Sequence, residues 1–382
     1  MDNMHLSFNQ PTPEQQKPVL ERIRELSNHP KIRGLWLNLM QTFIAILAAL
    51  IVGACLLLII GANPIEAYGA LFKGALGSWP ALARTLRTAT PLIFTGLAVV
   101  VAFRAGYIFL GMEGSLYFGA LSAALFGIYL APGLPAFLHL PLSMLAGFLA
   151  GGLWALFPAA LRARWKVDEV VSTLMLNYVA VLLVDHLVYS FFQDPTGGTN
   201  AERAFTVTVP ESSRLPFLSA KYGLTWAILI GAVLAVVLVW IYSRGVWGFE
   251  SDMTGFNRKF AHYGGVNTIR MAIVSMVLAG AIAGLGGTTE SLGNYGRYIS
   301  GFSSDFGFSG VTVALMGRLD PIGTLFGAFF FGALSSGGAA MELVTDIPRD
   351  MVVVLQGLIM LVVTAQAFFS MLRLSAKARP EE

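Results

Sequence analysis

The 382-residue sequence has few charged side chains and almost no cysteine. Lys, Arg, Asp and Glu make up 12% of it, and 55% of the residues are hydrophobic. A soluble globular protein carries about twice that share of charge, because charged groups must cover its surface on all sides. The composition therefore excludes a soluble protein and indicates an integral membrane protein.

Other absences narrow the class of protein further. The single cysteine, Cys55, excludes a disulfide framework and a Cys/His metal cluster, and a net charge of +3 leaves no face for nucleic acid. The sequence lacks the phosphate-binding motif G-x-x-x-x-G-K-[ST] and the catalytic motifs H-E-x-x-H and G-x-S-x-G. We therefore expect no enzyme, no bound cofactor or metal, and no ATP hydrolysis by this chain itself.

What is present instead is a succession of long apolar stretches. A membrane-spanning helix needs about 20 such residues, and the sequence predicts an all-α bundle of about ten spans. The stretches are Gln41–Gly61, Thr90–Phe103, Met112–Ala131, Leu140–Leu161, Val170–Phe192, Tyr222–Tyr242, Thr268–Gly287, Phe306–Gly317, Pro321–Ala340 and Met351–Met371.

Two of these stretches, Thr90–Phe103 and Phe306–Gly317, are too short to cross a bilayer unaided, which is typical of half-helices or re-entrant segments. If all ten stretches cross, 17 of the 25 Lys and Arg residues fall on the side of the N-terminus. Basic residues accumulate on the cytoplasmic side. We therefore expect both termini in the cytoplasm.

This arrangement divides the chain into three parts. Residues 1–40 form a cytoplasmic segment, in which the spacing of apolar residues between Glu14 and Asn28 favours either a surface-lying amphipathic helix or a solvated tail. Residues 41–371 form the membrane domain, with a long cytoplasmic loop at about residues 243–267. Residues 372–382 are a cytoplasmic tail.

An internal similarity points to a duplicated architecture. The segment Thr95–Arg104 lines up with Ser309–Arg318, and after one gap Phe118–Ser122 lines up with Phe331–Ser335. Repeats of this kind are common in transporter folds, where short segments at corresponding positions lie near the transport pathway. Three pairs of glycines four residues apart predict close packing between helices: Gly147 and Gly151, Gly280 and Gly284, and Gly323 and Gly327.

Ionisable residues in or near the membrane are functional candidates, because burying their charge is expensive. Glu113 lies at the start of a span, where its carboxylate either caps the helix or belongs to a pathway. Asp185 and His186 lie near the end of a span. Glu290 and Glu342 fall at predicted outer mouths, where we expect solvated side chains rather than a proton relay.

The loop at residues 243–267 carries the most specific local pattern. Asn257 can cap a short helix that Gly264 or Gly265 would end. One reading of this helix, with its aromatic and basic surface, is a contact that docks into a groove on a soluble partner. The other reading is an ordinary amphipathic connector.

The same loop resembles the coupling segment of the permeases of ABC importers for branched-chain amino acids, ribose and nucleosides. Further similar motifs follow in order along the chain, and the whole resemblance is greatest to the larger permease of bacterial nucleoside importers. The motifs are Gly255–Val266, Pro91–Ala98, Gly111–Gly114, Glu169–Tyr178, Leu278–Gly287 and Gly307–Arg318.

The resemblance implies a bacterial plasma-membrane permease subunit, most similar to those that import nucleosides. It also implies three partners in addition to the lipid bilayer: a cytoplasmic ATPase that uses ATP and Mg²⁺, a second and non-identical permease subunit, and an extracytoplasmic substrate-binding protein. The residues expected to couple transport to the ATPase are Asn257, Arg258, Phe260, Ala261, Tyr263, Gly264 and Gly265.

The substrate pathway is predicted at Glu113, Asn177, Gly307 and Gly310. The Asn177 amide offers both a donor and an acceptor to a solute, although in a membrane helix it equally serves to join helices. Two alternatives stay open for the function. One alternative to a nucleoside permease is an ABC permease for a monosaccharide or other small polar solute. The other is an ion-coupled secondary transporter that acts alone.

Overall fold

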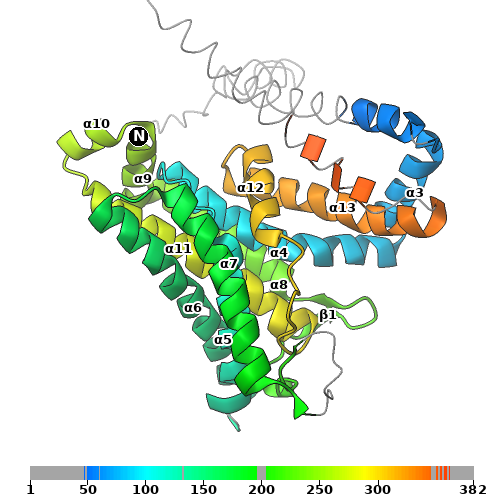
Figure 1. The fold of residues 1–382 in the computed structure, drawn as a ribbon, viewed down its shortest axis with the longest axis horizontal. Helices are drawn as coiled ribbons and strands as arrows, with labels where there is room; N and C mark the ends of the chain where they lie inside the picture. The colour runs from blue at the N-terminus through cyan, green and yellow to red at the C-terminus, as the bar shows by residue number, and fades with distance from the viewer. Residues whose placement is uncertain are drawn as a thin grey trace, which may run out of the picture.

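The computed structural model describes residues 50–59, 61–130, 133–195 and 204–345, together with residue 47 and several residues between 350 and 361. These parts are mainly helical (Figure 1). The α-helices are α3 (Pro64–Leu76), α4 (Trp79–Arg104), α5 (Met112–Leu125), α6 (Ala136–Trp165), α7 (Glu169–Leu187), α8 (Ala227–Arg244), α9 (Val246–Phe256), α10 (Arg258–Tyr263), α11 (Thr268–Thr289), α12 (Phe306–Met316) and α13 (Pro321–Thr345).

Seven helices among the described residues are long and apolar enough to cross a membrane. They are Trp79–Arg104, Met112–Leu130, Ala136–Trp165, Glu169–Phe192, Ala227–Arg244, Thr268–Asn294 and Pro321–Thr345. Three of them continue α5, α7 and α11 through single π-helical turns, η2 (Phe126–Leu130), η3 (Val188–Phe192) and η6 (Glu290–Asn294). The protein is therefore a multi-pass membrane protein, whereas the total of ten spans and the cytoplasmic placement of both ends stay predictions.

Parts of the predicted organisation lie outside the described residues. These are the N-terminal segment 1–40 with its amphipathic helix, the tail 372–382, and most of the apolar stretch Met351–Met371. The stretch Gln41–Gly61 is described only in part, and its apolar helix covers Leu50–Ile59.

The prediction that Thr90–Phe103 is a half-helix was wrong, because this stretch is the second half of the 26-residue helix α4. The first half escaped notice because it carries arginines and threonines. Ser78 caps its start with a hydrogen bond from the Ala81 N–H, and Pro80 lies in the first turn. The Thr88 and Thr90 hydroxyls donate to carbonyls one turn earlier in α4, so the helix accommodates them in an apolar setting. The second short stretch is confirmed as the 11-residue helix α12.

The described residues also include a small β-hairpin. A two-stranded antiparallel sheet, β1 (Phe217–Ser219) with β2 (Leu224–Thr225), precedes α8, which begins at Ala227 rather than at Tyr222. A single turn of 3-10 helix, η5 (Glu211–Ser213), lies just before it. This small hairpin departs from the expected all-α fold because Gly223, at φ +67°, turns the chain back on itself.

Helices α5, α6 and α11 are held together by glycines, as the four-residue spacing predicted. A Cβ on Gly151 would lie 2.4 Å from the carbonyl oxygen of Gly280, and one on Gly284 would lie 2.5 Å from the carbonyl oxygen of Gly147. Gly119 of α5 meets Gly284 in the same way, at 2.3 Å. Any side chain at these positions would force the backbones apart, so the glycines set the distance between the three helices.

The two copies of the internal similarity lie against each other. Gly310 of α12 packs on Thr95 of α4, at 2.5 Å from a hypothetical Cβ to the Thr95 hydroxyl oxygen. Gly96, which corresponds to Gly310 in the alignment, contacts Val313 and Thr324. Gly323 and Gly327 of α13 pack on Gly317 and Val313 at the other side of α12. The duplication itself stays a prediction.

Candidate functional site

The short helix α10 and the helix α9 before it project together from one end of the bundle (Figure 1). The Asn257 side chain caps α10, because its Oδ1 accepts hydrogen bonds from the backbone N–H groups of Lys259 at 3.0 Å and Phe260 at 3.1 Å. The helix ends at Gly264, and Gly265 follows with a φ of +88°. The predicted cap and stop of this helix are thus confirmed, while the connection before it contains a second helix, α9, that the sequence reading missed.

The exposed side of α10 is aromatic. Phe260 is 64% exposed and Tyr263 is 89% exposed, and Phe256 just before the cap is 91% exposed. Ala261 is fully buried on the opposite side of the helix. Aromatic groups that stand open to this degree are typical of a surface that is covered by a partner.

Arg258 joins the start of α10 to two other parts of the bundle, the connection between α4 and α5 and the start of α7. Its guanidinium donates to the carbonyl oxygen of Gly106, lies 3.7 Å from Glu169 Oε1, and stacks over the Tyr107 ring at 4.3 Å. Glu169 is buried, and its other oxygen pairs with Arg162 Nε at 3.0 Å. Arg258 and Glu169 therefore connect the start of α10 to the end of α6 and the beginning of α7.

Tyr107, on which Arg258 stacks, also contacts the start of α11. Its hydroxyl donates a hydrogen bond to the Thr268 carbonyl oxygen at 2.8 Å, at the start of α11. Burial raises the pKa of the Tyr107 hydroxyl, although nearby Arg258 acts in the opposite direction. The phenol therefore stays protonated and keeps donating this bond at neutral pH.

A second ion pair joins α4 to α9. Arg104 Nε and Nη2 donate to the two carboxylate oxygens of Asp252 at 2.8 and 2.5 Å, and the guanidinium lies 3.9 Å from the centre of the Tyr242 ring. Gly255 packs directly on the Arg104 carbonyl, with 2.0 Å to a hypothetical Cβ. Such two-point pairing restricts both distance and orientation, so α9 and the end of α4 move as one unit.

The predicted pathway residues come together around the start of α5. Glu113 is buried, and its Oε2 accepts a hydrogen bond from the Gly307 N–H at 2.7 Å. The sequence left two roles open for the Glu113 carboxylate, a cap on its own helix or a place in a pathway. In the structure it caps α12 instead, by a hydrogen bond to a residue 194 positions away. Gly307 has to be glycine, because a Cβ would lie 2.6 Å from the Glu113 backbone nitrogen.

Asn177 on α7 is bonded to the same region through both ends of its amide. Its Nδ2 donates to the Leu110 carbonyl at 2.7 Å, and its Oδ1 accepts from the Gly114 N–H at 2.9 Å. The side chain is 3% exposed. These bonds join α7 to the first turn of α5, which is the second of the two roles that the sequence left open for Asn177. They occupy the amide groups that would otherwise bond a solute. Gly310 lies further along α12, against Thr95.

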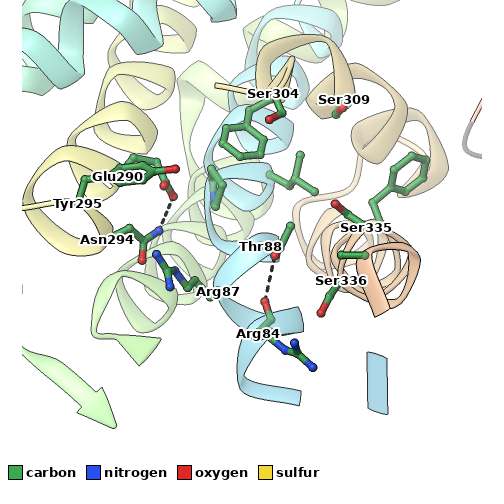
Figure 2. Close-up of a pocket in the computed structure, with 15 residues that line it drawn as sticks. Arg84, Arg87, Thr88, Glu290, Asn294, Tyr295, Ser304, Ser309, Ser335 and Ser336 are labelled. Atoms are coloured by element: carbon green, nitrogen blue, oxygen red, sulfur yellow. Dashed lines mark hydrogen bonds between the residues drawn. The ribbon is translucent and has the colours of Figure 1, made fainter. Parts of the chain in front are cut away.

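A cavity of about 400 Å³ opens between α4, η6, α12 and α13, beside this region (Figure 2). Its polar lining comes mainly from residues that the sequence reading did not select, namely Arg84, Arg87, Thr88, Asn294, Tyr295, Ser304, Ser309, Ser335 and Ser336. Pro91, Leu92, Phe306, Phe331 and Ala339 supply apolar walls, and Glu290 completes the set.

The expectation of a solvated Glu290 was wrong. Only 3% of it is exposed, and its Oε1 accepts a hydrogen bond from Asn294 Nδ2 at 2.8 Å. The π-helical turn η6 continues α11 past the predicted end at Gly287, so Glu290 stays inside the bundle and faces Arg87 of α4 (Figure 2). The sequence signal that could have indicated this site is a carboxylate directly after a predicted span.

The helical fold, the exposed aromatic helix and the polar cavity define a polytopic membrane transport protein. The family model "Branched-chain amino acid transport system / permease component" matches residues 81–364. The chain therefore belongs to this permease family, and it is a membrane permease subunit of an ABC importer.

Of three curated relatives, two are described as guanosine permeases and one as a glucose permease. The guanosine ABC transporter permease NupP of Bacillus subtilis is 33% identical, over 86% of this chain and 93% of NupP. The glucose ABC transporter permease TsgB13 of Haloferax volcanii is also 33% identical, over 88% of this chain and 90% of TsgB13. A second guanosine permease of Bacillus subtilis, NupQ, is 28% identical over 69% of this chain and 84% of NupQ.

Proposed function

We propose that the protein is the permease of a bacterial nucleoside importer and forms part of the transport pathway in the plasma membrane. The observation that carries this proposal is the similarity over most of the chain to a guanosine permease, NupP, in a chain with a 400 Å³ cavity of mixed polar and apolar lining. A nucleoside combines a flat heteroaromatic ring with several hydroxyl groups, and a cavity with both kinds of wall matches it.

The proposal includes three protein partners. A cytoplasmic ATPase receives α10 and uses ATP and Mg²⁺. An external binding protein delivers the solute. A second, non-identical permease completes the pathway, and the similarity of this one chain to both NupP and NupQ, two guanosine permeases of one bacterium, supports it.

In this mechanism α10 and both chain termini face the cytoplasm. Closure of the ATPase pushes on the exposed aromatic side of α10, formed by Phe256, Phe260 and Tyr263. Arg258 passes the displacement through Glu169 to α6 and α7, and Asp252 passes it to α4. Because α4 lines the cavity and α7 is bonded to the start of α5, the movement changes access to the solute.

The pathway residues have separate positions in this proposal. Gly310 and Gly307 allow α12 to pack closely on α4 and α5, and Glu113 fixes the beginning of α12. Asn177 fixes α7 to α5. We assign these four residues to the wall that positions the pathway, next to the cavity rather than inside it.

The proposal is tested by co-expressing the chain with an ABC ATPase and a second permease of the same organism, purifying the complex and reconstituting it in proteoliposomes with the binding protein. We expect uptake of radiolabelled guanosine that requires ATP and is unaffected by an ionophore. Uptake that an ionophore abolishes and that needs no ATPase would establish the ion-coupled carrier instead.

A second candidate solute is a monosaccharide, because TsgB13 is described as a glucose permease at the same identity as NupP. Competition separates the two solutes in the same vesicles. With labelled guanosine at a saturating concentration, a tenfold excess of an unlabelled nucleoside of equal affinity should reduce labelled uptake about tenfold, and glucose should leave it unchanged.

A further inference from the structure

The cavity between α4, η6, α12 and α13 contains two buried polar atoms with no hydrogen-bond partner among the described residues. They are Oδ1 of Asn294 and Oγ of Ser336, a residue that is 8% exposed. Leaving a buried polar atom without a partner is unfavourable, so most buried polar atoms in native proteins have one. Two of them in the lining of one cavity indicate that something else bonds to them there.

The orientation of the Asn294 amide follows from its neighbour. Its Nδ2 group donates to Glu290 Oε1, which leaves Oδ1 as an acceptor without a partner among the described residues. Figure 2 shows this pair on one side of the cavity, above Arg87, and Ser336 on the opposite side. The pair thus offers hydrogen-bond acceptors that only a molecule with O–H or N–H donors can satisfy.

Charge and shape limit the class of molecule further. Glu290, which is 3% exposed, faces Arg87, so these two charges offset each other, and the other arginine of the lining, Arg84, is exposed. A solute without net charge fits this lining, because it brings no unpaired charge into a low-dielectric setting. Phe306, Phe331 and Leu92 provide apolar wall on which a flat ring can lie. Arg84 and Tyr295 are exposed, so the cavity can be entered from the surface.

We infer that this cavity is a solute-binding chamber of the permease itself, in which the Glu290–Asn294 pair and Ser336 hydrogen-bond an uncharged nucleoside whose ring lies on the apolar wall. The inference rests on the proposed nucleoside import and adds to it a binding site with named residues. The acceptors suit the adjacent hydroxyls of a ribose, and Ser336 can serve as donor or acceptor on the other side.

Cys55 is the only cysteine in the sequence, so a single substitution gives a cysteine-free background for thiol labelling. In a C55S background, Ser336→Cys places one thiol in the chamber with little change in size. Ser243→Cys, an exposed position at the end of α8, is the accessible control outside the chamber. The purified complex is treated with a small methanethiosulfonate reagent, with and without guanosine, and the labelling rate of each variant is measured.

We expect Ser336→Cys to be labelled and guanosine to slow its labelling about tenfold at ten times the dissociation constant, as competition for one site predicts. Labelling of Ser243→Cys should not respond to guanosine. Adding Glu290→Gln to the Ser336→Cys variant should remove most of the protection, because the charged acceptor of the pair is lost.

Two results would overturn the chamber alone. One is an unprotected Ser336→Cys thiol in a complex that still imports guanosine with ATP, and the other is a thiol that the reagent does not reach at all. A wild-type complex that imports no guanosine would overturn the nucleoside function on which the chamber rests. The uptake assay therefore separates the two failures.

Discussion

Substitution of Glu169 by Gln tests how the movement of α10 reaches the bundle. Glu169 lies at the start of α7, where it is 7% exposed and pairs with Arg162 of α6 and Arg258 of α10. Glutamine keeps the shape of the side chain and one carbonyl oxygen for Arg162, but it removes the negative charge that holds both arginines.

The magnitude can be worked from the two contacts. A hydrogen bond to a charged group contributes about 1.5–3 kcal/mol and a neutral one about 0.5–1.5, so the 3.0 Å contact with Arg162 loses about 1–1.5 kcal/mol. The Arg258 contact is longer, at 3.7 Å, and that side chain is 38% exposed, so it adds about 0.2–1 kcal/mol. At 1.4 kcal/mol per factor of ten, the two losses, about 1.2–2.5 kcal/mol together, weaken the junction of α6, α7 and α10 about 7- to 60-fold.

The assay is ATP-dependent guanosine uptake by the reconstituted complex, measured beside its ATPase rate and thermal stability. We expect E169Q to lose about tenfold or more in uptake per ATP hydrolysed, while the complex still assembles. Asp168→Asn is the matched control, because it removes the neighbouring negative charge. Asp168 only caps α7 through the Val170 and Val171 N–H groups, and asparagine caps a helix equally well.

Equal coupling in E169Q and D168N would refute the proposed transmission. The same holds for a double-mutant cycle with Arg258→Gln: if the two substitutions have fully additive effects on coupling, Glu169 and Arg258 do not act through each other. A loss of yield in E169Q alone would indicate that the ion pair only supports folding.

Three further substitutions test separate parts of the structure. Ala261→Asp introduces a charge at a fully buried position of α10 and should abolish ATP-driven uptake while the protein still inserts, as uptake and a membrane immunoblot will show. Asn177→Leu leaves two backbone groups without partners, at about 1–3 kcal/mol each, so complex yield and uptake should fall together; lost uptake at normal yield would instead reveal a direct solute contact. Gly151→Val should lower the melting temperature strongly because its Cβ meets the Gly280 carbonyl, whereas Gly152→Ala, with its nearest neighbour at 3.3 Å, should have a small effect.

Local sequence was sufficient for features that depend on neighbours along the chain. Asn257, four residues before the buried Ala261, caps α10 through hydrogen bonds that span two or three residues, and Gly264 and Gly265 follow the helix. The spacing of Gly147 and Gly151 predicted a close helix contact, since residues four apart share one face of a helix. The family resemblance was likewise carried by continuous motifs.

Hydropathy misjudged helices whose polar residues are satisfied inside the fold. The first half of α4 reads as a polar connection, yet Thr88 and Thr90 bond their own helix and Thr85 bonds the Ala75 carbonyl of α3. Gly332 of α13 packs on Thr85 and Ala89 of the same half. The end of α11 reads as a mouth open to water, yet η6 carries Glu290 inward to Asn294 and Arg87. In both places the cost of burying polar groups is offset by partners that a window of neighbouring residues does not contain.

Three features could be predicted from the amino-acid sequence alone: a membrane protein with many apolar helices, the beginning and end of α10, and the glycines that face another helix. Only the tertiary structure decided which groups meet across the bundle: Glu113 with Gly307, Arg104 with Asp252, and Glu290 with the hydroxyl-lined cavity. Helix periodicity and capping act over one or two turns, whereas Arg104 and Asp252 are 148 residues apart and Glu113 and Gly307 are 194 residues apart. Such pairs depend on the packing of whole helices, which the glycine contacts fix.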